Sequence, residues 1–236
     1  MTGLLGMGIL LFSCSPARRA TGSAAPGVLQ DTSTYLSQVA GGTADSLFVD
    51  AVTAKQGGQT ARAEALFNAF LRLKPGSAAA YYELALLKGD AGDAAGTLAD
   101  ARQAATLSPE NPWYGILYGN ALAMTKAFDS AADVFHALAT RYPLENRYPY
   151  NEAVMLSDGG AYTRALVLFD TLEARLGINE EFVFQKQRIF LKLGEPDSAA
   201  AEIRRLIATD PLNARYYGLL AQVYASTGHR QEAVAL

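Results

Sequence analysis

The sequence has little of several residue types on which functional sites depend. Among its 236 residues there are one cysteine and two histidines. A single cysteine excludes an internal disulfide framework and any metal site built from several cysteines. Only 18% of the residues are charged and the formal net charge is −3, so the chain lacks the basic composition typical of nucleic-acid-binding proteins. No apolar run reaches the ~18 residues that a membrane-spanning helix needs.

The sequence also lacks the short motifs of common catalytic and metal sites. It contains no HExxH or CxxC motif, and neither His136 nor His229 has a ligand partner at metal spacing. The glycine-rich stretch 89–96 has no phosphate-loop Lys-Ser/Thr pair. Acidic pairs such as Glu180 and Glu181 are explained by a solvated helix start. We therefore predict no metal, no cofactor and no enzyme activity.

What the sequence does contain is a repeat of 34 residues. Prolines and one glycine share one phase of the repeat: Pro75, Pro109, Pro143, Gly177 and Pro211. Glycines share a second phase, interrupted by Lys126: Gly58, Gly92, Gly160, Gly194 and Gly228. Small residues share two more: Ala63, Thr97, Ala131, Ala165, Ala199 and Ala233, and then Ala51, Ala85, Gly119, Ala153 and Ala221. No insertion interrupts these series, so the pattern indicates stacked structural units.

Each unit has the pattern of a pair of helices. Residues with short oxygen-bearing side chains precede the first helix and are predicted N-caps: Thr43, Ser77, Asn111, Asn179 and Asn213, with Glu145 as a weaker cap in the fourth unit. The first helix ends at the turn glycine, and the second ends at the proline, which cannot continue it. One such hairpin cannot bury its apolar face alone, whereas stacked copies can.

This pattern resembles the tetratricopeptide repeat (TPR) family over about residues 44 to 236. The matching residues are the small pair Ala85 and Thr97, the turn glycine Gly92 and the closing Pro109, with their equivalents in other units. The resemblance implies an all-α fold, a right-handed TPR superhelix (α-solenoid) of five full helix hairpins plus a partial sixth. The solenoid is expected over 43–236, with units at about 44–77, 78–111, 112–145, 146–179, 180–213 and, in part, 214–236.

Two departures from the repeat lead to further expectations. Gln187 replaces a small residue in the fifth unit, and an amide buried there without partners would cost about 1–3 kcal/mol. We therefore expect Gln187 to be hydrogen-bonded or half exposed. The sixth unit stops at Leu236, before its closing proline position, and we expect the protein to continue beyond this residue; the alternative is a frayed last helix.

The first 42 residues precede the repeats. Residues 4–12 are an apolar run of signal-peptide length, followed by Ser13 and Cys14. This resembles a bacterial lipoprotein signal, in which the cysteine thiol takes the lipid. We predict a signal peptide over 1–13, then an acylated Cys14 and a flexible tether over 14–42, with a possible capping helix at its end. The alternatives are a cleaved secretion signal and a buried N-terminal helix.

The lipid anchor would place the protein in the cell envelope. Ser15 does not resemble the aspartate that retains lipoproteins in the inner membrane of enterobacteria, so the outer membrane is the default expectation. With a cleaved secretion signal instead, the protein would be periplasmic or secreted.

In the TPR family the first helices of the units line a concave groove, and the resemblance implies that their second, fifth, ninth and neighbouring positions face a peptide or protein partner. Those positions are Tyr82, Glu83, Trp113, Asn120, Arg147, Tyr150, Asn151, Phe184, Arg188 and Arg215. Aromatic rings and forked arginine donors suit peptide capture. Asn120, Asn151 and Arg188 are similar to part of a carboxylate clamp, whose full set of Lys and Asn is missing. The alternative for each residue is packing between units or exposure to solvent.

We predict a non-catalytic, membrane-anchored scaffold for protein–protein interaction. Two alternatives remain open at this point. One is an outer-membrane pilot or assembly lipoprotein for a secretin, a pilus or a β-barrel, because such proteins are similar in carrying five or six TPR-like units behind an acylated cysteine. The other is an accessory TPR region of a larger enzyme or sensor that continues past residue 236.

Overall fold

The computed structural model of the protein describes residues 44–226, 228 and 233. The predicted cap Thr43, the signal peptide, Cys14 and the tether with its capping helix lie outside the described residues. The described part of the chain forms eleven α-helices and contains no strand, so the prediction of an all-α fold is confirmed. None of these helices has the length and apolar character required to cross a membrane.

The chain divides into two compact units, Met1–Ala69 and Phe70–Leu236, and each is described by itself. The first unit contains α2 (Ala44–Gln56) and most of α3 (Thr60–Leu73), which ends in the second. Phe48 of α2 packs edge-on against Phe67 of α3, with ring centroids 5.5 Å apart and planes at 74°. This aromatic pair, with the fully buried Phe67, forms the centre of the first hairpin.

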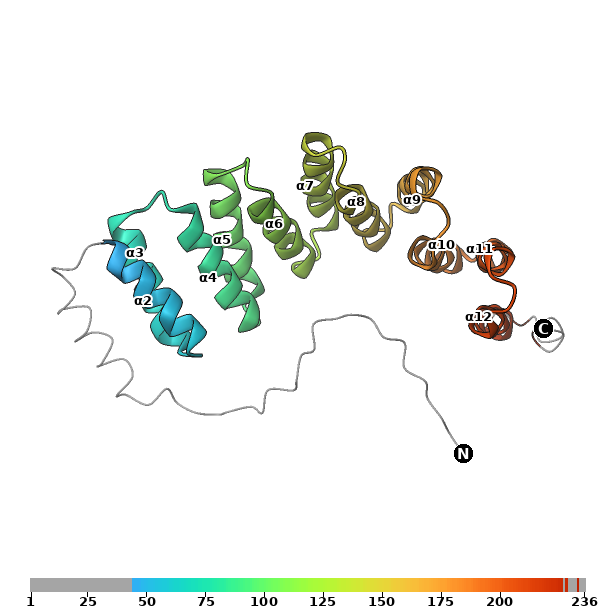
Figure 1. The fold of residues 1–236 in the computed structure, drawn as a ribbon, viewed down its shortest axis with the longest axis horizontal. Coiled ribbons are helices and arrows are strands. Elements are labelled where there is room, and N and C mark those ends of the chain that lie inside the picture. The colour runs from blue at the N-terminus through green and yellow to red at the C-terminus, as the bar shows by residue number, and fades with distance from the viewer. Residues whose placement is uncertain (1–43, 227, 229–232, 234–236) are drawn as a thin grey trace, which may run out of the picture. The chain divides into compact units, whose positions relative to one another are not determined.

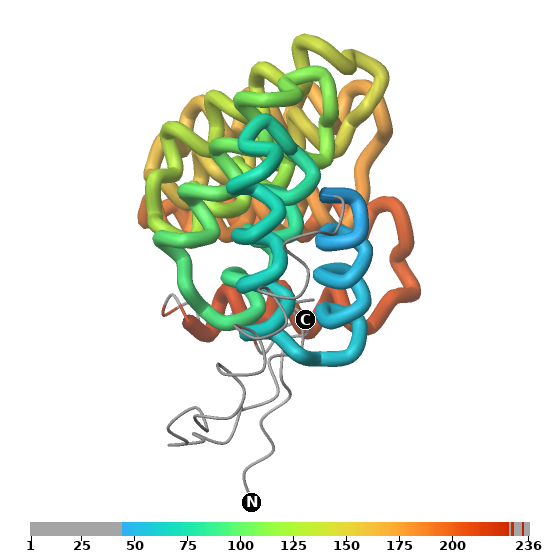
Figure 2. The backbone as a smooth tube through the Cα atoms, turned by 90° about the vertical axis from the view of Figure 1, so that its left-hand side faces the viewer, coloured from blue at the N-terminus to red at the C-terminus, as the bar shows by residue number. Residues whose placement is uncertain are grey.

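The second unit contains the other helices, and each packs against the next in chain order (Figures 1 and 2). They are α4 (Ala78–Asp90), α5 (Ala94–Leu107), α6 (Pro112–Met124), α7 (Phe128–Arg141), α8 (Arg147–Asp158), α9 (Tyr162–Leu176), α10 (Glu180–Leu193), α11 (Pro196–Thr209) and α12 (Ala214–Ser226). Short turns join them, so neighbours in sequence are neighbours in space. This succession of helix hairpins is a solenoid.

The N-caps explain where several of these helices begin. Four predicted caps are confirmed, since their side-chain oxygens accept hydrogen bonds from first-turn N–H groups: Ser77, Asn111, Asn179 and Asn213. The cap predicted at Glu145 is wrong. Helix α8 starts one residue later, after Asn146, and the Glu145 carboxylate instead lies 3.1 Å from Arg147 Nε.

The turn inside each hairpin requires a left-handed backbone. Gly92, Gly160 and Gly194 have φ angles of 79°, 87° and 75°. Lys126, which interrupts the glycine series, also has a positive φ of 61°. A side chain in this conformation costs roughly 1–2 kcal/mol, so stacking of the hairpins holds the turn even where glycine is absent.

The core of the second unit places small residues against aromatic rings. A Cβ atom added at Gly119 of α6 would lie 2.8 Å from Phe135 Cε2 of α7, which is closer than packed atoms approach. Phe135 and Phe169, one repeat apart, are both fully buried. Gln187, at the small position of the fifth unit, is half-buried as expected. The small residue at Gly119 therefore sets how closely the two helices of its hairpin approach.

Candidate functional site

Helix α6 has a composition unusual for a surface helix, because none of its residues from Pro112 to Met124 is charged. Trp113, Leu117, Asn120 and Met124 follow one another at steps of four, three and four, so they share one face. Trp113 is 59% exposed and Met124 47%. Asn120 is exposed, and Leu117 is half-buried. We call these four residues the α6 stripe, an open apolar surface with one amide in its middle.

Aromatic and cationic groups from both neighbouring units lie against α6. Tyr82 of α4 stands with its ring centroid 5.1 Å from that of Tyr114. On the other side, the Arg147 guanidinium of α8 lies 5.8 Å from the centroid of the Trp113 ring. A cation over an indole face is stabilising by about 0.5–1 kcal/mol at an exposed site. The structure thus brings together three of the predicted site residues, Tyr82, Trp113 and Arg147, around α6.

A second group of predicted site residues centres on Tyr150 of α8. Its hydroxyl donates a hydrogen bond to the Glu181 carboxylate of α10 and accepts one from Gln185 Nε2 at 3.2 Å. Burial and the bond to Glu181 raise the pKa of Tyr150 above its ordinary value, so the hydroxyl stays a donor. Nearby on the same two helices, Arg188 Nη2 lies 3.1 Å from Asp158 Oδ1. These contacts join α8 to α10 across consecutive units.

A third group lies between α10 and α12. The Arg215 guanidinium lies 5.6 Å from the centroid of the Phe184 ring and 2.7 Å from Glu180 Oε2. Each predicted site arginine therefore has a carboxylate of this chain beside it, so a partner carboxylate would have to compete for it. The two remaining predicted residues, Glu83 and Asn151, are half-buried.

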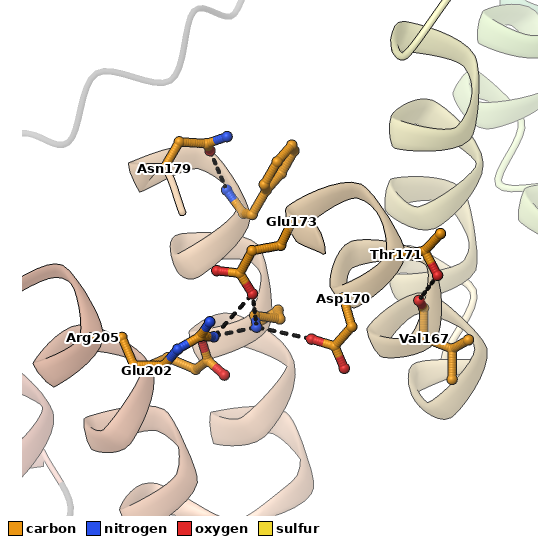
Figure 3. A network of polar contacts seen from close by, with 9 residues as sticks. Val167, Asp170, Thr171, Glu173, Asn179, Glu202 and Arg205 are labelled. Carbon is orange, nitrogen blue, oxygen red and sulfur yellow. Dashed lines mark hydrogen bonds and ion pairs between the residues drawn. The ribbon is translucent and has the colours of Figure 1, made fainter. Parts of the chain in front are cut away.

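The structure also contains a buried polar cluster that sequence reasoning missed. Lys186 of α10 is 1% exposed. Its Nζ lies 2.9 Å from Asp170, 2.8 Å from Glu173 and 3.0 Å from Glu202. Arg205 joins the cluster at 3.0 Å from Glu173 and 2.9 Å from Glu202. Figure 3 shows Asp170 and Glu173 of α9 and Glu202 and Arg205 of α11 converging on one place.

Electrostatics explain how Lys186 stays charged without solvent. Burial lowers the pKa of a lysine, but here the hydrogen bonds that Lys186 donates to Glu173, Asp170 and Glu202 outweigh burial and raise its pKa above the ordinary value. A raised pKa means that the cluster contributes stability below the unfolded-state value of about 10.4, which is lost as the pH rises through the folded-state value. The cluster is therefore intact at neutral pH.

A signal for this cluster existed in the repeat itself. Glu152 and Lys186 occupy equivalent positions one repeat apart, where the second and sixth units have the buried Leu84 and Leu220. Glu152 is also buried, and His136 Nδ1 lies 3.1 Å from its Oε1. A charged residue at a repeat position that is apolar in other units predicts a buried charge with a partner of opposite charge. Among the described residues, no group of three or more His, Cys, Asp or Glu side chains could hold a metal ion.

Comparison with known proteins agrees with this architecture. Residues 187–236 match the family model described as tetratricopeptide repeat. No curated protein matches the sequence.

Several solved structures share the fold. One is a tetratricopeptide repeat protein from Parabacteroides merdae, with a TM-score of 0.65 and 16% identity, covering 81% of this chain and 76% of that one. A second is YrrB, described as a TPR protein with an unusual peptide-binding site, with a TM-score of 0.61 and 13% identity over 80% of this chain and 96% of that one. A third is MamA from Desulfovibrio magneticus RS-1, with a TM-score of 0.60 and 12% identity over 72% and 96%. At these identities the likeness shows the fold.

Proposed function

Since this chain is built of tetratricopeptide repeats, we propose that it is a non-catalytic interaction scaffold whose α6 stripe binds an apolar segment of a partner protein. The observation that carries this proposal is the uncharged surface of α6, with Trp113 and Met124 open to solvent. Exposed apolar patches on soluble domains mark interaction sites more often than isolated exposed side chains do.

The residues around the stripe support a peptide as the partner. Trp113 offers a large rigid surface, and aromatic side chains of this kind are enriched among the residues that dominate binding energy. Asn120, in the middle of the stripe, can both donate to and accept from a peptide backbone. Arg147 and the Tyr82–Tyr114 pair border the stripe on its two sides. The structurally similar YrrB is described as having a peptide-binding site, which supports the same class of ligand.

A selection experiment tests this proposal. A random dodecapeptide phage library is panned against the full chain, and the affinities of the enriched peptides are then measured by fluorescence anisotropy. We expect peptides with two or more aromatic or aliphatic residues. The double variant Trp113→Ala/Met124→Ser should bind them at least about tenfold more weakly, because central aromatic contacts contribute ~1.4 kcal/mol or more.

The matched control is Val167→Ser on α9, which removes an equally exposed apolar side chain (61%) from another helix. It should bind the enriched peptides with unchanged affinity. Circular dichroism spectra of all variants should overlay that of the wild type. Equal loss of binding in both variants, or enrichment of no apolar peptide, would refute the α6 stripe as the binding surface.

We further propose that the scaffold is held at a membrane, in the outer membrane by default, through a lipid on Cys14. The support is the apolar run 4–12 followed directly by Ser13 and Cys14, the one cysteine of the chain. In a bacterial host fed an alkyne-tagged palmitate, the wild type should carry the label and sediment with membranes. Cys14→Ser should lose the label and leave the membrane fraction, whereas Ser15→Ala should keep both. An unlabelled wild type would contradict the anchor.

A further inference from the structure

A hollow separate from the α6 stripe lies between α5, α6 and α7. Its volume is about 370 Å³, within the range of small-molecule sites of roughly 300–1,000 Å³. Its lining is apolar except at one residue: Ala105, Pro109, Gly115, Val134, Ala137, Leu138 and Arg141.

Gly115 lines the hollow without a side chain of its own. Its equivalents one and two repeats away are Tyr81, Pro149 and Val183, and Val183 is fully buried. At Gly115 even a Cβ atom would meet Leu138 Cδ2 at 3.1 Å, so a larger residue would press against Leu138 in the wall of the hollow. The hollow therefore lies beside a position that carries a side chain in the second, fourth and fifth units.

Charged side chains occupy the equivalent positions two repeats further along the chain. Ala105, Val134 and Ala137 of the hollow correspond to three members of the Lys186 cluster, Glu173, Glu202 and Arg205, each 68 residues (twice 34) later. One interface of the solenoid thus fills this place with ion pairs, and the other leaves it apolar and open. The hollow is a property of these residues and not of the repeat.

Arg141 supplies the one charge at the hollow. Its guanidinium donates a hydrogen bond to the Pro109 carbonyl, and no carboxylate in the described part of the chain forms an ion pair with it. The residue is exposed. Because a guanidinium has five N–H donors, further donors remain for an oxygen ligand. The hollow therefore combines an apolar wall with an uncompensated cation.

We propose that this hollow binds a fatty acid, with the acyl chain against Gly115 and Leu138 and the carboxylate on Arg141. The C-terminus of a peptide would also offer a carboxylate to Arg141, but a peptide brings amide N–H groups that need acceptors. The lining side chains offer no acceptor for these groups. A peptide N–H held against this lining would have water as its partner or none, whereas an acyl chain has no donor to satisfy, so the lining favours an acyl chain.

Isothermal titration calorimetry of the full chain with decanoate and with decanol tests the proposal. Decanoate should bind with a stoichiometry of one. Arg141→Gln should weaken decanoate about tenfold, because a charge-assisted bond is lost, and should leave decanol within about twofold. Gly115→Val and Ala137→Leu, which fill the hollow from its inner and exposed sides, should weaken both ligands at least about tenfold.

Arg102→Gln on α5 removes an exposed arginine outside the lining and should leave decanoate binding unchanged. If Gly115→Val does not fold, Ala137→Leu still tests the hollow. Ala137 is exposed, so a leucine at this position has solvent on one side and should not disturb folding. The proposal fails if the wild type does not bind decanoate, or if Arg141→Gln and Ala137→Leu bind it as the wild type does. A peptide ending in leucine that binds more tightly than decanoate at this site would overturn the fatty acid as the ligand.

Discussion

Replacing Lys186 with alanine is expected to lower the free energy of unfolding by about 3–5 kcal/mol, because it leaves buried carboxylates without their shared cation. Glu173 and Glu202 are 8% and 12% exposed at their side chains, so water cannot replace the lost ammonium group. Arg205 contacts both of them and compensates for part of the charge. Urea denaturation at pH 7, followed by circular dichroism, measures the effect.

Lys192→Ala is the matched control, since it removes a lysine from the exposed surface of the same helix. It should change stability by less than about 1 kcal/mol, including the loss of its contact with the Tyr162 ring. Hydrogen exchange should locate the effect of Lys186→Ala in α9 to α11 and leave α4 and α5 protected, because repeat units contact mainly their neighbours. A Lys186→Ala variant as stable as Lys192→Ala would show that the cluster contributes nothing net.

Phe135→Ala is expected to cost about 3–5 kcal/mol, the range for a fully buried phenylalanine. Phe135 is 0% exposed and clusters with Leu138 and Tyr148 beneath α6 and α8. Gly119 cannot fill the resulting cavity, because it has no side chain and its backbone already borders the ring. The urea midpoint should fall, and peptides that bind the α6 stripe should bind more weakly because α6 loses its support.

Val167→Ala is the control for this truncation, because Val167 is 61% exposed on α9. A surface change of this kind is usually within about 0.5 kcal/mol. If Phe135→Ala cost no more than Val167→Ala, the close approach of α6 and α7 at Gly119 would not depend on the ring.

The sequence predicted the fold well because its signals are local. A capping oxygen such as that of Ser77 or Asn179 acts within one helical turn, and its hydrogen bond depends little on the rest of the protein. The prediction failed at Glu145 for a local reason as well: Arg147 engages its carboxylate and the helix begins after Asn146.

The candidate site was predictable only in part. The position of each residue within the repeat predicted the candidate site residues. It did not predict their partners, which lie about one repeat away: Glu181 for Tyr150, Asp158 for Arg188 and Glu180 for Arg215. The sequence does not state which rotamer each side chain adopts or which neighbour it reaches. These pairings follow from the spacing and rotation between stacked hairpins.

By itself, therefore, the sequence determined that the chain forms helix hairpins in a regular order, because capping, turn formation and apolar periodicity operate over a few residues. Only the tertiary structure decided that Lys186 is buried and charged while the space beside Gly115 stays open and apolar. The physical reason is that both outcomes depend on side chains from three helices that lie close together. Only the stacking of the hairpins brings these three helices into contact.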